Sequence, residues 1–322
     1  MGYFPKIIEA EKGFGNPVKV ILLNAKKQYL ETLSRIYPEP HNSLLAGILV
    51  GAKRNLPQGL KDQLAKTSTS HIVAISGFNI TIIVQTISKL LQRFGRRTSF
   101  IVSLLSIIMF VIITGAQASV VRAGIMGVLA LIALNAGRLY AVTNALVFAA
   151  ALMLIVNPLT LHFDVGFQLS FLALIGLVFL QPKIEVLFAP WPKFLTNYLL
   201  PALCAQIFTL PVLLLNFDQL SVIGIVTNVF VVPAIPLLML FGFLSGLIGL
   251  FSIVLAQPMY WLTWILISYI IEIIKFSSLI PMSSITVNNF SPVFVVIYYL
   301  LLSIIILFFY NSNLIHLWKP KQ

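Results

Sequence analysis

Long apolar runs alternate with short polar connections along this chain. We count nine runs, each close to the ~20 residues that cross a ~30 Å hydrocarbon core as an α-helix. They lie at about residues 72–91, 98–115, 119–136, 139–157, 163–181, 198–216, 220–250, 254–275 and 292–310. Transmembrane β-strands would read instead as alternating segments of about ten residues. The pattern therefore predicts an all-α polytopic membrane protein with about nine transmembrane helices.

Three stretches depart from a simple crossing. The seventh run is too long for one helix, and its Pro233 and Pro236 remove backbone donors, which favours a broken or bent helix or two segments with one re-entrant. Residues 43–52 are too short to span and are expected to be interfacial or buried. Residues 18–37 have helical apolar spacing, typical of the end of another domain or of an amphipathic helix on the membrane.

Composition supports the membrane assignment. Apolar residues make up 59% of the 322 and charged residues only 9%, whereas soluble domains have roughly 25% charged residues. The net charge is +12. Two explanations of the excess basic residues are equally compatible with the sequence: they lie on solvent-exposed faces and determine the membrane topology, or they form a positive surface that attracts a polyanion. The single cysteine, Cys204, lies in an apolar run and is expected to be a small core residue.

Basic residues predict the orientation. If the spans alternate, the charged connections after the first, third and fifth spans and the C-terminal tail share one side. The residues concerned are Lys89, Arg93, Arg96, Arg97, Arg138, Lys183, Lys193, Lys319 and Lys321. Positive charge in short loops marks the cytoplasmic side. We therefore expect the N-terminus outside and the C-terminus in the cytoplasm, although the basic segment before the first span would then lie outside.

Several polar side chains interrupt the apolar runs. The first run, HIVAISGFNITIIV, carries five residues that a lipid-facing helix would avoid, and buried polar groups in membranes are often functional. When depth is compared at ~1.5 Å per residue, one set falls in the outer half of the membrane. Its members are Ser76, Asn79, Arg122, Asp164, Gln168, Gln206 and Asn228. We hypothesise that they line a water-filled vestibule that opens outward.

The vestibule hypothesis makes one specific prediction, for Arg122, and leaves an alternative open for three other residues. Arg122 needs a partner or water at this depth, and Asp164 is the acid best placed to pair with it. Ser76, Gln206 and Asn228 are explained equally well as residues that hydrogen-bond one helix to another.

We identify no catalytic constellation. Ser76 and His71 are five residues apart, without the G-x-S-x-G turn of a hydrolase, and His71 is interpreted as a helix-entry residue. The four histidines lack metal-binding spacing, and no G-x-x-x-x-G-K sequence is present. We therefore expect a protein that is not an enzyme and has neither metal nor cofactor.

Four segments together resemble the ComEC-type competence proteins. HIVAISGFNITII resembles their HLLAISGLH element, with Asn79 where the family usually has His, and GAQASVVRAGIM is similar to their Ser, Arg-Ala element. NPLTLHFDVGFQLSFLALIG resembles an Asn-Pro, then Asp-x-Gly-Phe-Gln-Leu-Ser element, and TLPVLLLNFDQLSVIGIVTNVFVVPAIP a Pro, Phe, Ser, Asn, Pro pattern. The motif positions that we interpret as structural are His71, Gly77, Ser119, Gly166, Ser170, Pro211 and Pro233.

This resemblance, which covers roughly residues 41–250, implies a multi-pass channel of the bacterial inner membrane that conducts single-stranded DNA into the cytoplasm during natural transformation. Arg122 and the basic outer segment would face phosphates, and Phe78, Phe167 and Phe171 are candidates to stack on bases. Implied partners are the lipid bilayer, a DNA receptor, a translocase ATPase and a nuclease domain encoded separately. We interpret residues 1–40 as the remnant of an outer domain with a linker helix, 41–282 as the channel domain, and 283–322 as a last span and basic tail.

Two other classes remain open from the sequence. One is a secondary transporter of a small anionic solute, with its site at the broken seventh helix. The other is a membrane scaffold subunit that does not conduct.

Overall fold

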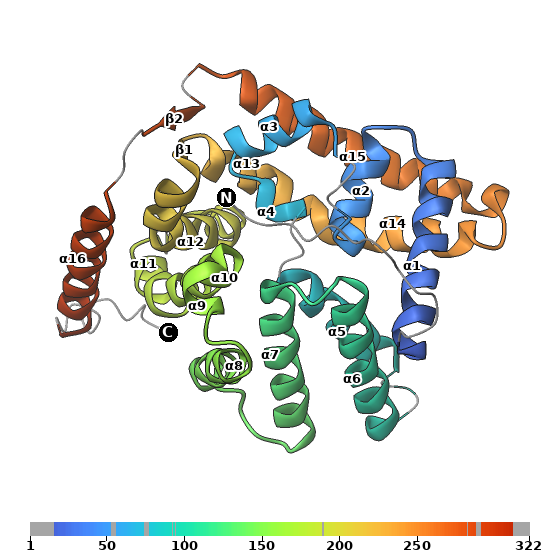
Figure 1. Cartoon of the computed structure of the whole chain (residues 1–322), viewed down its shortest axis with the longest axis horizontal. Helices are drawn as coiled ribbons and strands as arrows, with labels where there is room; N and C mark the ends of the chain where they lie inside the picture. The colour runs from blue at the N-terminus through green and yellow to red at the C-terminus, as the bar shows by residue number, and fades with distance from the viewer. Residues whose placement is uncertain are drawn as a thin grey trace, which may run out of the picture.

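The computed structural model describes residues 16–52, 56–73, 77–91, 93, 95–188, 190–281, 283–287 and 291–311, which are mostly helical (Figure 1). The first helices are α1 (Pro17–Ile36), α2 (His41–Val50), α3 (Gln58–Lys66), α4 (Ser70–Val73), α5 (Gly77–Leu91), α6 (Arg96–Ile113), α7 (Ala118–Asn135) and α8 (Val142–Val156). The later ones are α9 (Thr160–Phe163), α10 (Val165–Ile175), α11 (Gln181–Leu187), α12 (Lys193–Phe217), α13 (Gly224–Val231), α14 (Ile235–Gly249), α15 (Ile253–Leu279) and α16 (Pro292–Asn311).

Short irregular elements join some of these helices. A π-helical turn, η2 (Gly176–Leu180), connects α10 to α11, and a 3₁₀ turn, η3 (Val232–Ala234), connects α13 to α14. Strands β1 (Gln219–Ser221) and β2 (Ser284–Thr286) form an antiparallel ladder in which Leu220 is opposite Ile285. The expected all-α membrane fold agrees with the structure, apart from this small ladder.

Six helical segments in the described ranges are long and apolar enough to cross a membrane. They are Arg96–Ile113, Ala118–Asn135, Val165–Val186, Thr196–Phe217, Gly224–Gly249 and Ile253–Leu279. The count of nine is not confirmed. The expected first span corresponds to α4 and α5 with residues 74–76 outside the described part, and α8, with 15 residues, extends only about 22 Å.

The expected break in the seventh run is present at the prolines. Pro233 lies within η3, and Pro236 lies in the first turn of α14, where a missing N–H is tolerated. The carbonyl of Phe230, which a continuous helix would bond to the N–H of Ala234, accepts a hydrogen bond from the hydroxyl of Tyr269 on α15 at 3.2 Å. A neighbouring helix thus satisfies a carbonyl at the break.

The largest core surrounds α2, in which every residue from Ser43 to Val50 is buried. Residues of α1, α3, α4, α14 and α15 pack on it, and Figure 1 shows α1 and α2 against the α14–α15 pair. Smaller clusters join α5, α6 and α7, then α7, α8 and α10, and finally η2 and α12 with α16. The region around α7 therefore lies where two of these clusters meet.

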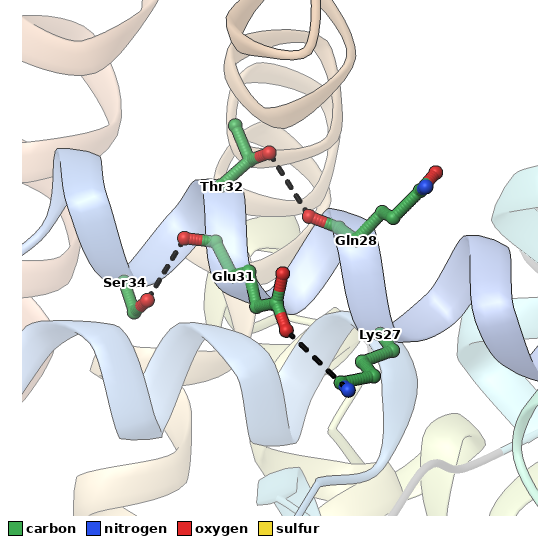
Figure 2. A network of polar contacts seen from close by, with 5 residues as sticks. All are labelled: Lys27, Gln28, Glu31, Thr32 and Ser34. Atoms are coloured by element: carbon green, nitrogen blue, oxygen red, sulfur yellow. Dashed lines mark hydrogen bonds and ion pairs between the residues drawn. The ribbon is translucent and has the colours of Figure 1, made fainter.

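Helix α1 is an integral part of the main core. Its predicted helical pattern is confirmed, with Leu22, Tyr29 and Leu33 buried. Its other face carries polar contacts, including an ion pair between Lys27 and Glu31 (Figure 2). The proposed domain boundary at residue 40 stays a prediction, although α1 shares its core with later helices.

Two glycines of α14 allow α1 and α2 to approach closely. A Cβ added to Gly246 would collide with the ring of Tyr29, and one on Gly242 would lie 2.8 Å from Cδ1 of Leu45. The Tyr29 hydroxyl then donates to the Gly242 carbonyl at 3.3 Å. Small residues at such spacing let membrane helices pack closely, so the Gly242–Gly246 pair fixes where α1 docks.

Gly246→Ala should therefore destabilise the protein by about 1–3 kcal/mol, because the added methyl group overpacks the Tyr29 contact. The measurement is equilibrium unfolding in detergent. Gly59→Ala is the matched control, since no atom lies within 4 Å of its Cβ position. Equal stabilities of the two variants would contradict the proposed role of Gly246.

Tyrosines of α16 contact the backbone of α12 near another proline, Pro211, in the C-terminal half of that helix. Pro211 has no N–H, so the carbonyl of Ile207 lacks its usual donor within the helix. The hydroxyl of Tyr298 donates to that carbonyl at 3.0 Å, and the hydroxyl of Tyr299 donates to the carbonyl of Phe208 at 2.8 Å. Helix α16 is thus held to α12 where its backbone needs external donors.

Tyr298→Phe should lower the free energy of unfolding by about 1 kcal/mol, the usual size of such a hydrogen bond. In a Pro211→Ala background the same change should cost less, because alanine at this position restores an N–H for the Ile207 carbonyl. A double-mutant cycle measured by unfolding in detergent tests this coupling. Additive effects would show that the hydroxyl and the proline are not linked.

Candidate functional site

Arg122 is the centre of the candidate site. It lies in the second turn of α7, and only 8% of the residue is exposed. Its Nη1 donates to the backbone carbonyl of Ser170 on α10, and its Cζ lies 5.6 Å from the ring centroid of Phe171. Nη2 lies 3.4 Å from the position that a Cβ on Gly77 of α5 would occupy. Three helices therefore meet around one guanidinium.

Small residues make this meeting possible. A Cβ on Gly77 would also lie 3.2 Å from the Cβ of Ala123, and one on Gly124 would lie 2.9 Å from Cγ2 of Val111 on α6. Larger side chains at these positions would push α5 and α6 away from α7. This agrees with the interpretation of Gly77 as a structural motif position.

The expected ion pair between Arg122 and Asp164 is wrong. Among the described residues the ion pairs are Lys27–Glu31 and Lys275–Glu272, and Asp164 instead accepts a hydrogen bond from the backbone N–H of Phe167 at 3.0 Å. Asp164 is the N-cap of α10. A carboxylate is well suited to this place because it satisfies a free N–H and faces the positive end of the helix dipole.

The remaining polar residues of the hypothesis lie at several places. Asn79 is buried and donates from Nδ2 to the Ile48 carbonyl of α2 at 3.2 Å. Gln168 donates from Nε2 to the carbonyls of Leu161 and His162, which ties α9 to α10.

Gln206 and Asn228 flank the strand β1. Gln206 of α12 donates to the carbonyl of Ser221 in β1 at 3.0 Å, which favours a structural role in tying α12 to this strand. Asn228 on α13 is buried, and its Oδ1 has no hydrogen-bond partner among the described residues. Asn228 therefore keeps an unsatisfied acceptor beside the broken helix.

Other predicted positions can be placed more briefly. Ser76 lies outside the described residues. Nδ1 of His71 lies 2.9 Å from the carbonyl of Ser68, in agreement with a helix-entry role, and Ser119 lies one turn before Arg122 on α7. Gly166 is in the first turn of α10, close to the Asp164 carboxylate. The vestibule that would unite all these residues stays a prediction.

The phenylalanines expected to stack on bases have structural contacts. Phe167 and Phe171 are buried, with ring centroids 4.4 Å apart, and Phe171 faces the Arg122 guanidinium. The Phe78 side chain is outside the described atoms. In this structure Phe171 packs beneath the cation and Phe167 packs against Phe171, so the two described rings are not an open platform.

Several basic side chains bind helix ends. Nζ of Lys26 donates to the carbonyls of Val50 and Ile113, at the C-terminal ends of α2 and α6. Arg96 donates from Nη2 to the carbonyls of Leu134 and Asn135 at the end of α7. Cations are favourable at these ends because the last carbonyls lack helical donors. Burial lowers the pKa of the Lys26 ammonium.

Sequence reasoning missed the partners that hold Arg122. Ser170 was identified by its motif, but it contributes a backbone carbonyl, which no side-chain pattern specifies. Lys26 was counted with the other basic residues, although its position among apolar residues of a helix was a signal that it could turn inward. Among the described residues, no group of three or more His, Cys, Asp or Glu is arranged to hold a metal ion.

The fold and site define a polytopic helical membrane protein with a buried arginine between helices. The chain belongs to the competence protein family, since the family model described as Competence protein matches residues 48–311. It is also 27% identical over 285 residues to ComE operon protein 3 of Bacillus subtilis (strain 168), which covers 87% of this chain and 36% of that protein. The chain thus spans about a third of the length of this curated relative. No solved structure matches.

The family match confirms the resemblance that the four sequence segments carried. The match begins within α2 and ends at the last residue of α16. It therefore includes α5, α7 and α10, which together surround Arg122.

Substitutions of Asp164 distinguish a helix cap from an ion pair. Asp164→Ala should destabilise the protein by about 1 kcal/mol, whereas Asp164→Asn should be nearly neutral because Asn also caps helices well. Unfolding in detergent measures both. If Asn proved as costly as Ala, the capping explanation would be lost and the negative charge itself would be required.

Proposed function

We propose that this chain forms the path by which single-stranded DNA crosses the bacterial inner membrane during natural transformation. Membership of the competence family and six helices able to span a membrane support this proposal. A strand with one charge on each phosphate needs cationic side chains along its path.

The observation that carries the proposal is the uncompensated charge of Arg122. The guanidinium is almost fully buried, yet in the described part of the chain its contacts are a carbonyl and an aromatic ring. A buried cation is costly unless it meets an anion or water. Because Asp164 caps α10 and leaves Arg122 without a carboxylate, the charge remains available to a phosphate.

Buried polar atoms without hydrogen-bond partners also support the proposed DNA path. Nε of Arg122 and Oδ1 of Asn228 are both buried and have no hydrogen-bond partner among the described residues. Such atoms usually contact water or a ligand. Arg122 would contact phosphates, while the amide of Asn228 has both the donor and the acceptor that base edges or hydrated phosphates require.

The proposed role also implies a membrane orientation and a set of partner proteins. The N-terminus would lie outside and the C-terminus in the cytoplasm, as the loop charges predict. A DNA receptor would deliver the strand, a translocase ATPase would drive it inward, and a separately encoded nuclease domain would remove the other strand.

A secondary transporter of a small anionic solute is the alternative. It is favoured by one observation, the unsatisfied Oδ1 of Asn228 beside the 3₁₀ break of a membrane helix. Broken helices commonly form solute and ion sites. Proteoliposomes separate the two functions, because a carrier would exchange small anions without passing an oligonucleotide.

Arg122→Ala should reduce uptake of labelled DNA by about tenfold or more, because one charge-assisted contact contributes roughly 1.5–3 kcal/mol. Arg122→Lys should retain part of the activity, since the charge remains but the fork geometry is lost. Uptake is measured in transformable cells, with the amount of protein in the membrane determined in parallel.

Arg138→Ala is the matched control, because Arg138 is an exposed arginine in the connection between α7 and α8. It should leave uptake near the wild-type level. Wild-type uptake by Arg122→Ala at a normal protein level would overturn the proposed path through this site.

A further inference from the structure

A groove lined by charged, polar and apolar side chains lies between α1 and α2, away from Arg122. Its volume is about 340 Å³. The residues of α1 that line it are Leu23, Lys26, Lys27, Leu30, Glu31 and Ser34. Figure 2 shows Lys27, Glu31 and Ser34 on one side of α1, with Gln28 and Thr32 on the other. The groove therefore presents cations, a carboxylate and a hydroxyl within two turns of one helix.

The contacts of Lys26 indicate the depth of the groove relative to the membrane. The Lys26 ammonium donates to the carbonyl of Ile113 at 2.8 Å, and Ile113 is the last residue of a membrane-spanning candidate. This end of the groove thus lies where a helix leaves the hydrocarbon, which is the level of lipid headgroups. The exposed ion pair of Lys27 and Glu31 is also compatible with that level and not with the hydrocarbon core.

The charges in the groove fit a zwitterion better than a polyanion. Lys26 and Lys27 provide two ammonium groups, and Glu31 provides one carboxylate. The Lys27–Glu31 contact is long, at 3.9 Å, with 77% and 54% of the side chains exposed, so it can open around a ligand. A phosphate would accept from Lys27 and from the third N–H of Lys26, whose other two N–H groups bind the carbonyls of Val50 and Ile113, and a primary ammonium would pair with Glu31.

Apolar surface continues from the groove. Leu23 and Leu30 line it, and Val20, one turn before Leu23 on the same side of α1, is 46% exposed. A ligand with acyl chains would cover these side chains, whereas a DNA strand would leave them in water and meet the Glu31 charge. We propose that the groove between α1 and α2 binds the headgroup of phosphatidylethanolamine.

Native mass spectrometry of the purified chain in detergent tests this binding. Phosphatidylethanolamine, phosphatidylcholine and phosphatidylglycerol are offered at equal concentrations. Phosphatidylcholine is the decisive comparison, because it has the same charges but no N–H donor for Glu31. We expect phosphatidylethanolamine to be retained about tenfold more strongly, the effect of one charge-assisted hydrogen bond.

Variants then locate the site. Glu31→Gln should abolish the preference, and Lys27→Met should weaken retention of phosphatidylethanolamine. Glu272→Gln is the matched control, because Glu272 forms a similar exposed 3.9 Å pair with Lys275 on α15. Because the comparison of lipids uses the unaltered protein, it remains informative even where a variant folds poorly.

Equal retention of phosphatidylethanolamine and phosphatidylcholine would overturn the proposal, and so would stronger retention of phosphatidylglycerol or a preference unchanged in Glu31→Gln. Displacement of the lipid by a short single-stranded oligonucleotide would assign the groove to DNA instead. Competition by inorganic phosphate alone would reduce it to a free phosphate site. None of these results depends on DNA uptake, so the conduction proposal is tested separately.

Discussion

Hydrocarbon offers no hydrogen bonds, so each backbone group that a proline leaves free must find a partner inside the protein. A tyrosine hydroxyl supplies that partner to the Ile207 carbonyl, which Pro211 leaves free, and tyrosines also bind neighbouring carbonyls near Pro211 and Pro233. Tyr298 and Tyr299 reach α12 next to Pro211, and Tyr269 reaches the carbonyl of Phe230 before Pro233. The phenol suits this task because its ring packs as an apolar group and its hydroxyl reaches past it. Carbonyls of α12 and of the α13–α14 segment are thus bound by residues far away in the sequence.

The basic residues divide by what they contact. Lys26 and Arg96 donate to the last carbonyls of helices, so part of the strong positive charge of this chain is used within the fold. Arg122 differs, since its charge is buried without a carboxylate and one of its nitrogens has no partner among the described residues. A net charge of +12 therefore overstates the surface offered to a polyanion, and the position of one arginine is more informative than the total.

Sequence periodicity was sufficient for the helical membrane fold, the helix from residue 18 and the break at Pro233, because each depends on local spacing and backbone chemistry. It was also sufficient for the family, through four ordered segments. The number of spans stays a prediction, because helices such as α8 are apolar but short. The pairing of Arg122 with Asp164 failed for a related reason. Depth along separate helices places residues at one level, but it does not decide whether a carboxylate turns toward a cation or toward its own helix end.

The docking of α1 has a consequence for the order of assembly. Tyr29 hydrogen-bonds to Gly242, 213 residues later, and Tyr37 to Ser245, 208 residues later. A chain is synthesised from its N-terminus, so α1 leaves the ribosome long before its partner helix exists. Lys26 can bind the ends of α2 and α6 soon after these helices form, but the contacts of α1 with α14 must wait, and the main core can close only after α14 and α15 are in place. The first helix of the described chain is therefore among the last to reach its final position.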